Sequence, residues 1–346
     1  MLVLLTVFFV TLSSIYLLCP LAERLGWVDK PDCRKQHDGQ IPMIGGITMF
    51  AGLAIASLLS LPPLTLHLVW FWSALLIVLL GTLDDRVGLG AALRLGVQTV
   101  IALLLILGSG LFLENMGDLL GLGDLHVGLA GYWLTVLAVL AAINAFNMMD
   151  GIDGLAGSMA LVTFVGFIVL FSMTRNSYGL WLTGLLLAAL VPYLLANLSL
   201  LPFGRKVFLG DAGSMLIGLS VVWLLIFGSQ GEYRSFRPVT ALWLVAIPLM
   251  DMVAIMFRRL RKGKSPLAAD RDHLHHILMR NGLSDRQALA RITLAALVLM
   301  GIGLGGEWLQ LPDSLMLSMF LLLFMGYAYA LQHLSNSEHL RLGQTL

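Results

Sequence analysis

The feature of this sequence that most constrains its fold is a series of apolar segments, each about 20 residues long, that recurs from one end of the chain to the other. A helix of about 20 apolar residues crosses the roughly 30 Å hydrocarbon layer of a membrane. Charged residues make up only 12% of the 346 residues, whereas a soluble domain has roughly 25%. No soluble core could bury so much apolar surface, and we therefore expect an all-α polytopic membrane protein.

Hydropathy predicts about eleven transmembrane helices in a single domain, residues 1–334, which a short tail, residues 335–346, follows. A long loop, residues 258–291, separates the ninth expected span from the tenth. The expected spans lie near residues 2–21, 43–61, 67–83, 93–112, 130–146, 155–173, 179–198, 213–228, 239–257, 292–310 and 315–333.

The distribution of basic residues predicts the orientation of these spans. Of the 21 lysine and arginine residues, all but Arg175, Arg234 and Arg237 fall on one side of the predicted membrane. Because basic residues concentrate in cytosolic loops, the N-terminus should be periplasmic and the C-terminus cytoplasmic. The polar clusters described below all fall in the predicted cytosolic loops, so an active site would lie at the cytosolic face.

Charge and cysteine content exclude several other classes of protein. The net charge is +1, and no basic stripe is interleaved with aromatic residues, which argues against nucleic-acid binding. Two cysteines, Cys19 and Cys33, are too few for a disulfide framework or a cysteine-based zinc site. The absence of an internal repeat leaves an inverted-repeat transporter without support in the sequence.

Five carboxylates lie at the predicted cytosolic ends of the spans, namely Asp84, Asp85, Asp150, Asp153 and Asp211. Each has an ordinary alternative role as a solvated helix end, a turn or a helix N-cap. Together they would repel one another unless a divalent cation bound among them, and Mg²⁺ is held by one or two carboxylates plus substrate phosphates. A cation pore is the alternative, against which the basic residues of the neighbouring loops argue.

Two of these carboxylates stand in a local pattern that favours a ligand site. Asn144, Asn147 and Asp150 are spaced by three residues, which places them on one face of a helix inside an apolar run. Buried amides need partners, so a function outweighs a simple helix exit there. Asp211 is flanked by glycines at a predicted helix N-terminus, where free N–H groups favour phosphate.

The loop 258–291 adds cations and imidazoles. His273, His275 and His276 could meet phosphates as neutral donors or as cations, whereas zinc would need ligands that are not nearby. The basic run from Arg258 to Lys264 fits substrate, anionic lipid or a mere topology signal. Asp251 lies inside a span, so we expect it to have an internal partner.

With these residues in view, the chain resembles the polyprenyl-phosphate N-acetylhexosamine-1-phosphate transferases, and most closely those that begin O-antigen and enterobacterial common antigen synthesis. The resemblance extends from about Val28 to Ala288. Its motifs are Val28 to Pro31, His37 to Gly46, Leu83 to Arg86, Asn144 to Gly157, Val207 to Gly218, Pro248 to Met252 and Arg271 to His276.

The resemblance implies a role for each matching residue. Asp211 and Asn147 would hold Mg²⁺, for which Mn²⁺ could substitute. Asp153, Gly154 and Leu155 would contact the uracil, and Phe208 would stack on it. The residues implied in catalysis are Asp84, Asp85, Asp150, His273, His275 and His276, and those implied in further substrate contacts are His37, Asn197, Arg258 and Arg271.

The implied reaction transfers GlcNAc 1-phosphate from UDP-GlcNAc to undecaprenyl phosphate and releases UMP. The enzyme would lie in the bacterial inner membrane, in contact with membrane lipid, and could act as a homodimer. UDP-MurNAc-pentapeptide or UDP-GalNAc as donor are alternatives, and a transporter of an anionic lipid or a nucleotide sugar is a further one. Direct displacement and a two-step route through an aspartyl intermediate both fit these residues.

Overall fold

The structure of the chain, a computed structural model, describes residues 1–29, 39–59, 64–201, 205–263, 265 and 273–343, apart from the side chains of residue 64 and of residues 335–343. Its longer helices are α1 (Leu2–Arg24), α3 (Leu64–Val87), α4 (Ala91–Ser109), α5 (Ala130–Met149), α6 (Leu155–Met173), α7 (Ser177–Asn197), α8 (Gly210–Ser229), α12 (Asp285–Trp308) and α13 (Asp313–Gly343). The shorter helices are α2 (Gly45–Leu59), α9 (Pro238–Leu244), α10 (Ala246–Arg261), α11 (Leu274–Arg280) and the 3-10 helix η1 (Gly231–Tyr233).

The described helices confirm a helical, multi-pass membrane protein. Nine of them are long and apolar enough to cross a membrane, α2 is a shorter apolar helix of 15 residues, and α9 with α10 forms a bent pair. Each expected span coincides with one of these helices or with the bent pair, while the number of crossings and their orientation stay predictions. The small departure from an all-α fold is one antiparallel pair of two-residue strands, β1 (Val28–Asp29) and β2 (Ile41–Pro42).

The expected span 239–257 is broken near Val245, where α9 and α10 meet at an angle of 82°. Pro248 has no N–H group, so the carbonyl of Leu244 loses the partner that a continuous helix would provide. The hydroxyl group of Thr163 in α6 donates to this carbonyl at 2.9 Å. Because a backbone group in the membrane interior must find a partner, this bond from a neighbouring helix stabilises the bend.

The C-terminal segment refines an expectation from the sequence, and the loop after α4 adds a hairpin. The helix α13 continues to Gly343, so the segment expected as a tail begins as a continuation of the last span. The glycine-rich loop after α4 folds as a hairpin, in which Asn115 and His126 form an antiparallel bridge. The side chain of Gln230 holds this hairpin by bonding both the N–H and the carbonyl groups of Asn115.

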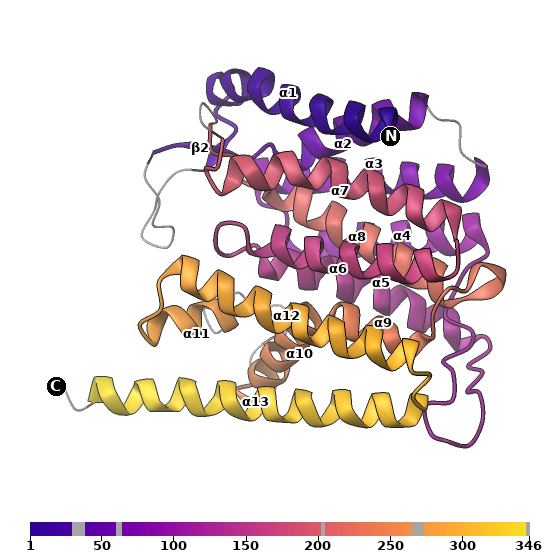
Figure 1. Cartoon of the computed structure of the whole chain (residues 1–346). Helices are drawn as coiled ribbons and strands as arrows, with labels where there is room; N and C mark the ends of the chain where they lie inside the picture. The colour runs from indigo at the N-terminus through magenta and orange to yellow at the C-terminus, as the bar shows by residue number, and fades with distance from the viewer. Residues whose placement is uncertain (30–38, 60–63, 202–204, 264, 266–272, 344–346) are drawn as a thin grey trace.

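The helix α8 is the centre of the bundle. Within its apolar window 94% of the residues are buried, against 22% in α1 and 17% in α13, and these two outer helices lie at opposite edges in Figure 1. Side chains at Gly46 of α2 and Gly81 of α3 would collide with the backbone of α8 at Gly213 and Ala212. The absence of a Cβ atom therefore lets three helices meet, backbone against backbone, at the first turn of α8.

We predict that Gly81→Ala lowers the free energy of unfolding by about 1 to 3 kcal/mol, the usual effect of overpacking a close-packed interior. Gly301→Ala in α12 is the matched control, because a Cβ atom there would meet nothing within 4 Å. In a helix interior this control change should be neutral or stabilise by about 0.5 to 1 kcal/mol. Thermal unfolding of the detergent-solubilised variants measures both, and equal midpoints would contradict the close approach of α3 and α8.

Candidate active site

The candidate site begins with a contact between the end of α3 and the start of α8. The carboxylate of Asp85 accepts hydrogen bonds from the backbone N–H groups of Asp211 at 2.8 Å and Ala212 at 3.3 Å. The first N–H groups of a helix have no partner within the helix, so Asp85 caps α8 from outside. Gly210 makes this possible, since it has a φ of 70° and a Cβ atom there would lie 2.6 Å from Asp85 Oδ2.

The neighbouring carboxylate, Asp84, is held by the turn into α4. Its side chain is only 4% exposed. One oxygen accepts from the N–H group of Leu89 at 2.7 Å, and the other accepts from Arg94 Nη1 at 2.7 Å. The Asp84 carboxylate also interacts with that of Asp211. The structure thus brings three of the predicted acidic residues together and places one guanidinium beside them.

Asn147, near the end of α5, completes this group. Its Nδ2 atom lies 2.6 Å from Asp211 Oδ1 and 3.0 Å from Ser214 Oγ. The two residues that the sequence predicted as a metal pair are therefore in direct contact, although they are 64 positions apart. Asn144, one turn earlier, bonds instead to Gln98 at 2.8 Å and to its own helix, which gives it a structural role between α4 and α5.

These residues fit a divalent cation by charge. When ionised, Asp84, Asp85 and Asp211 carry three negative charges, of which Arg94 balances one, and the two that remain equal the charge of one Mg²⁺. In the part of the chain that the structure describes, no three His, Cys, Asp or Glu side chains form a metal site by themselves. Mg²⁺ needs no such group, because substrate phosphates and water supply most of its ligands.

A second part of the site lies around Gly154, the residue before α6. Its N–H group donates to Asn197 Oδ1 at 2.6 Å, and Asn197 Nδ2 donates to the carbonyl of Val207 at 2.9 Å. Asn197 is buried and uses both ends of its amide in this bridge, so it joins the predicted uracil loop to the segment before α8. Leu155, the first residue of α6, buries its side chain fully in the core.

The sequence analysis missed Lys206. Its Nζ atom lies 2.5 Å from Asp153 Oδ2 and 5.4 Å from the centre of the Phe208 ring. This lysine therefore touches both side chains that the resemblance implies in uracil binding. No local signal in the sequence identifies this contact, since Lys206 and Asp153 are 53 positions apart.

The histidine cluster meets the same region through His275. This residue is 1% exposed, it packs against Gly151 in the loop after α5, and neither ring nitrogen has a hydrogen-bond partner among the described residues. The ring centres of His275 and His276 are 4.2 Å apart, and those of His273 and His275 are 5.6 Å apart. Burial, with the charges of His276 and His273, lowers the pKa of His275 from 6.5 to about 3, so this imidazole is neutral at cytosolic pH.

The other predicted site residues are Asp150, Arg258, His37 and Arg271. Asp150 is exposed at the C-terminal cap of α5, and Arg258 lies in the last turn of α10. His37 and Arg271 lie outside the described residues. The internal partner expected for Asp251 is present, because this carboxylate accepts hydrogen bonds from His273, Leu274 and Tyr327.

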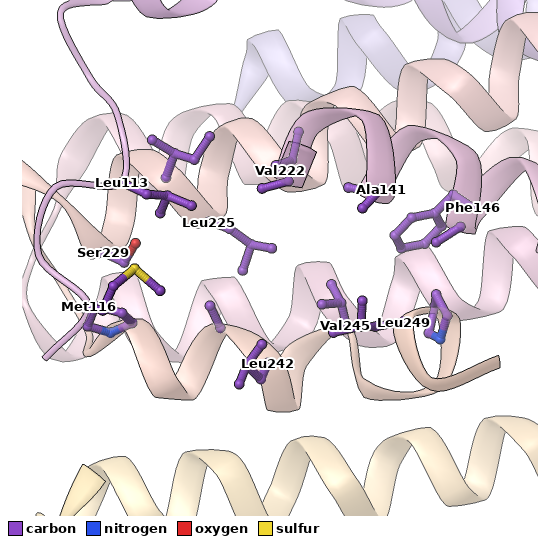
Figure 2. A pocket seen from close by; sticks show the side chains of 17 residues that line it. Leu113, Met116, Ala141, Phe146, Val222, Leu225, Ser229, Leu242, Val245 and Leu249 are labelled. Carbon is purple, nitrogen blue, oxygen red and sulfur yellow. The ribbon is translucent and has the colours of Figure 1, made fainter. Parts of the chain in front are cut away.

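The bundle also contains an apolar pocket. It lies between α5, α8 and the bent pair of α9 and α10, and its cavity volume is about 200 Å³, below the roughly 300 to 1,000 Å³ of usual ligand sites. Figure 2 shows Leu113 and Met116 at one end and Phe146 and Leu249 at the other. Its lining residues on α8, from Val222 to Ser229, lie in the half of that helix away from Asp211.

Comparisons with known proteins identify the family of the chain. The sequence model described as Glycosyl transferase family 4 matches residues 67–229. The undecaprenyl-phosphate alpha-N-acetylglucosaminyl 1-phosphate transferase of Salmonella typhi is 46% identical over 334 residues, which cover 95% of this chain and 90% of that protein. The proteins of the same name from Yersinia pestis and Escherichia coli strain K12 are 44% and 42% identical, over 94% and 95% of this chain and 90% of each relative.

We predict that Arg94→Ala destabilises the protein by about 3 kcal/mol, because removing one partner of a buried ion pair leaves the other charge uncompensated. Arg205→Ala is the matched control, since Arg205 pairs with Glu23 where both side chains are about half exposed (52% and 43%). Such exposed pairs contribute about 0 to 1 kcal/mol. Thermal unfolding gives the midpoint of each variant. An equal shift of both midpoints would show that the pair of Asp84 and Arg94 contributes no more to stability than the exposed pair.

We also predict that His275 makes the protein less stable in mild acid. The folded-state pKa of about 3 lies below the unfolded value of 6.5, so the contribution of His275 is complete above pH 6.5 and is lost as the pH falls towards 3. At pH 5 the loss should be about 2 kcal/mol. Unfolding of wild type and His275→Gln at pH 7.5 and 5 tests this, with the exposed His126→Gln as control, and parallel slopes for all three proteins would contradict it.

Proposed function

The chain belongs to glycosyl transferase family 4, and we propose that it transfers GlcNAc 1-phosphate from UDP-GlcNAc to undecaprenyl phosphate, with release of UMP. The observation that carries this proposal is the contact of Asp211 with Asn147 beside Asp84 and Asp85, which brings polar groups of α3, α5 and α8 together.

We propose Asp211 and Asn147 as the protein ligands of Mg²⁺. When bound, this ion neutralises phosphate charge, which is the main requirement of phosphoryl transfer. Asp85 fixes Asp211 by capping its helix, and Ser214 and Asn147 restrict the Asp211 side chain. The chain itself thus contributes mainly alignment, and alignment can supply a large part of a rate enhancement.

For the acceptor lipid, the site supports a role of Asp84 in positioning rather than in proton removal. Both of its oxygens already accept hydrogen bonds from Leu89 and Arg94. A phosphate monoester has a second pKa near 6, so undecaprenyl phosphate needs no strong base at cytosolic pH. Because Asp85 is similarly engaged by α8, we favour direct attack of the acceptor phosphate on the β-phosphorus of the donor over an aspartyl intermediate.

For the donor, we propose that uracil binds at Asp153 and Phe208. Lys206 contacts both side chains, so the nucleotide has to displace it. The Asp153 and Lys206 side chains are 40% and 29% exposed, and an ion pair of this kind contributes at most about 1 kcal/mol. Displacement is therefore easy, and it frees a cation beside the diphosphate.

We place the enzyme in the bacterial inner membrane with its site at the cytosolic face, where UDP-sugars occur, and we take a homodimer as one candidate assembly. Its product would serve a lipid-linked polysaccharide such as O-antigen or enterobacterial common antigen. The test is to incubate the purified protein with sugar-labelled UDP-GlcNAc, undecaprenyl phosphate and MgCl₂. Label should enter the lipid phase in proportion to the UMP released.

Other results of this assay would identify the alternatives. If lipid product forms only with UDP-MurNAc-pentapeptide or only with UDP-GalNAc, that nucleotide sugar is the donor in place of UDP-GlcNAc. Uptake of label into proteoliposomes without any lipid product would indicate a transporter, and would overturn the proposal.

We predict that Asp211→Asn reduces product formation by about 10³-fold or more at saturating Mg²⁺, since it removes a charged metal ligand and keeps the shape of the side chain. Asp124→Asn is the control of equal chemistry, because Asp124 lies in the hairpin after α4, where it accepts from Asn115. The test compares the turnover rates of both variants with that of wild type. Activity of Asp211→Asn within a few-fold of wild type would remove Asp211 from the metal site.

We predict that Asp153→Ala weakens UMP binding by about 10- to 150-fold, the value of a hydrogen bond to a charged group of roughly 1.5 to 3 kcal/mol. Glu23→Ala removes a carboxylate of similar exposure, paired with Arg205, and should leave UMP affinity unchanged. Titration calorimetry with UMP measures both variants. If Asp153→Ala binds UMP as tightly as wild type, the uracil lies elsewhere.

A further inference from the structure

We infer that Asp251 and Tyr327 act together as a positioning unit for His273, which places the last helix, α13, among the elements that set the geometry of the active site. The inference rests on the proposed function, because it assigns His273 a contact with the phosphates of that reaction. It concerns residues that lie outside the segment 67–229 matched by the family model.

The unit consists of three groups from three different segments, two of them buried and the third, Tyr327, half-buried. Asp251 of α10 is 1% exposed and His273, just before α11, is 8% exposed. The distance from His273 Nδ1 to Asp251 Oδ2 is 3.1 Å. Tyr327 of α13 donates its hydroxyl proton to Asp251 Oδ1 at 2.9 Å. Each member is thus far from the others in sequence and is joined to them by a directed contact.

The same carboxylate fixes the start of the histidine helix. The N–H group of Leu274, the first residue of α11, donates to Asp251 Oδ1 at 3.0 Å, and the N-cap residue, His273, makes no side-chain cap of its own. Asp251 therefore holds the backbone and the imidazole of one short segment at once. His275, one residue further on, packs against Gly151 in the loop that precedes the donor site.

The chemistry of the contact selects one form of His273. An ionised carboxylate can only accept hydrogen bonds, so the proton of the imidazole resides on Nδ1 and the Nε2 atom is left for a ligand. A hydrogen bond from Nε2 to an oxygen of the diphosphate then needs a second proton on the ring, which the negative charge of the diphosphate itself favours. Tyr327 adds a second donor that fixes the orientation of the Asp251 carboxylate.

The two oxygens of Asp251 allow this role to be separated from a structural one. Oδ1 serves Leu274 and Tyr327, whereas Oδ2 serves His273 alone. Asp251→Asn can keep a carbonyl oxygen toward Leu274 and Tyr327 and present an NH₂ group to His273. The variant should therefore fold normally and switch the imidazole proton from Nδ1 to Nε2.

The decisive experiment compares full-length Asp251→Asn with wild type. We expect kcat to fall by about 10²-fold or more, as wrong-tautomer variants of carboxylate–histidine pairs do, while UMP affinity and the unfolding midpoint change little. In ¹⁵N-histidine-labelled protein, the His273 signal, assigned by its loss in His273→Gln, should change from the Nδ1–H to the Nε2–H pattern. Retention of kcat within twofold would overturn the inference, and so would a parallel loss of stability and UMP binding.

A second pair of variants tests the contribution of α13. Tyr327→Phe removes one hydrogen bond to Asp251 and should lower kcat by about 2- to 10-fold. Tyr329→Phe, two residues along the same helix at a side chain that is 71% exposed, should leave kcat unchanged. Equal kcat values for these two variants would exclude α13 from the unit.

A failure of the proposed function can be distinguished from a failure of this inference. If the wild type forms no lipid product, the ¹⁵N pattern of His273 still shows whether Asp251 sets its tautomer, because that measurement needs no turnover. A wild-type Nε2–H pattern would overturn the positioning role whatever the enzyme's activity.

Discussion

The site depends on one contact, the capping of α8 by the Asp85 carboxylate of α3. Inside a membrane the free N–H groups at a helix start cannot rely on water, and the residue before α8, Leu209, supplies no side-chain cap. Asp85 meets this need from a neighbouring helix. In doing so it fixes the register of α3 against α8, and this register brings Asp84 and Asp211 together.

The glycines at this junction serve the same contact. Side chains at Gly46 or Gly81 would push α2 or α3 away from the first turn of α8. The distance of 2.8 Å between the Asp211 backbone nitrogen and Asp85 Oδ1 would then increase. The close approach concentrates acidic charge in a region of low polarity, where like charges repel strongly. Cations stabilise an arrangement of this kind, and Arg94 beside Asp84 is one of them.

Much of the fold could be predicted from the sequence, because the signals were local. The spans follow from runs of apolar residues, and the pairing of Asp211 with Asn147 followed from motifs that the resemblance supplied. The 82° bend between α9 and α10 was missed, since Pro248 alone is compatible with a mild kink and the partner that stabilises a sharp one, Thr163, is 81 positions away from Leu244. Lys206 was missed for a similar reason, as no local pattern shows which carboxylate a lysine will contact.

The histidines show most clearly what the sequence could not decide. Three imidazoles near arginines could be cations or neutral groups, and spacing does not separate these cases. Burial against Gly151 makes His275 neutral, whereas His273 Nδ1 lies 3.1 Å from the Asp251 carboxylate. Two histidines that are two residues apart thus differ in their hydrogen-bond partners, because neither ring nitrogen of His275 has one among the described residues. A neutral, buried His275 can shape the loop next to the donor, while His273, held from behind by Asp251, is the member of the cluster that is suited to meet phosphate charge.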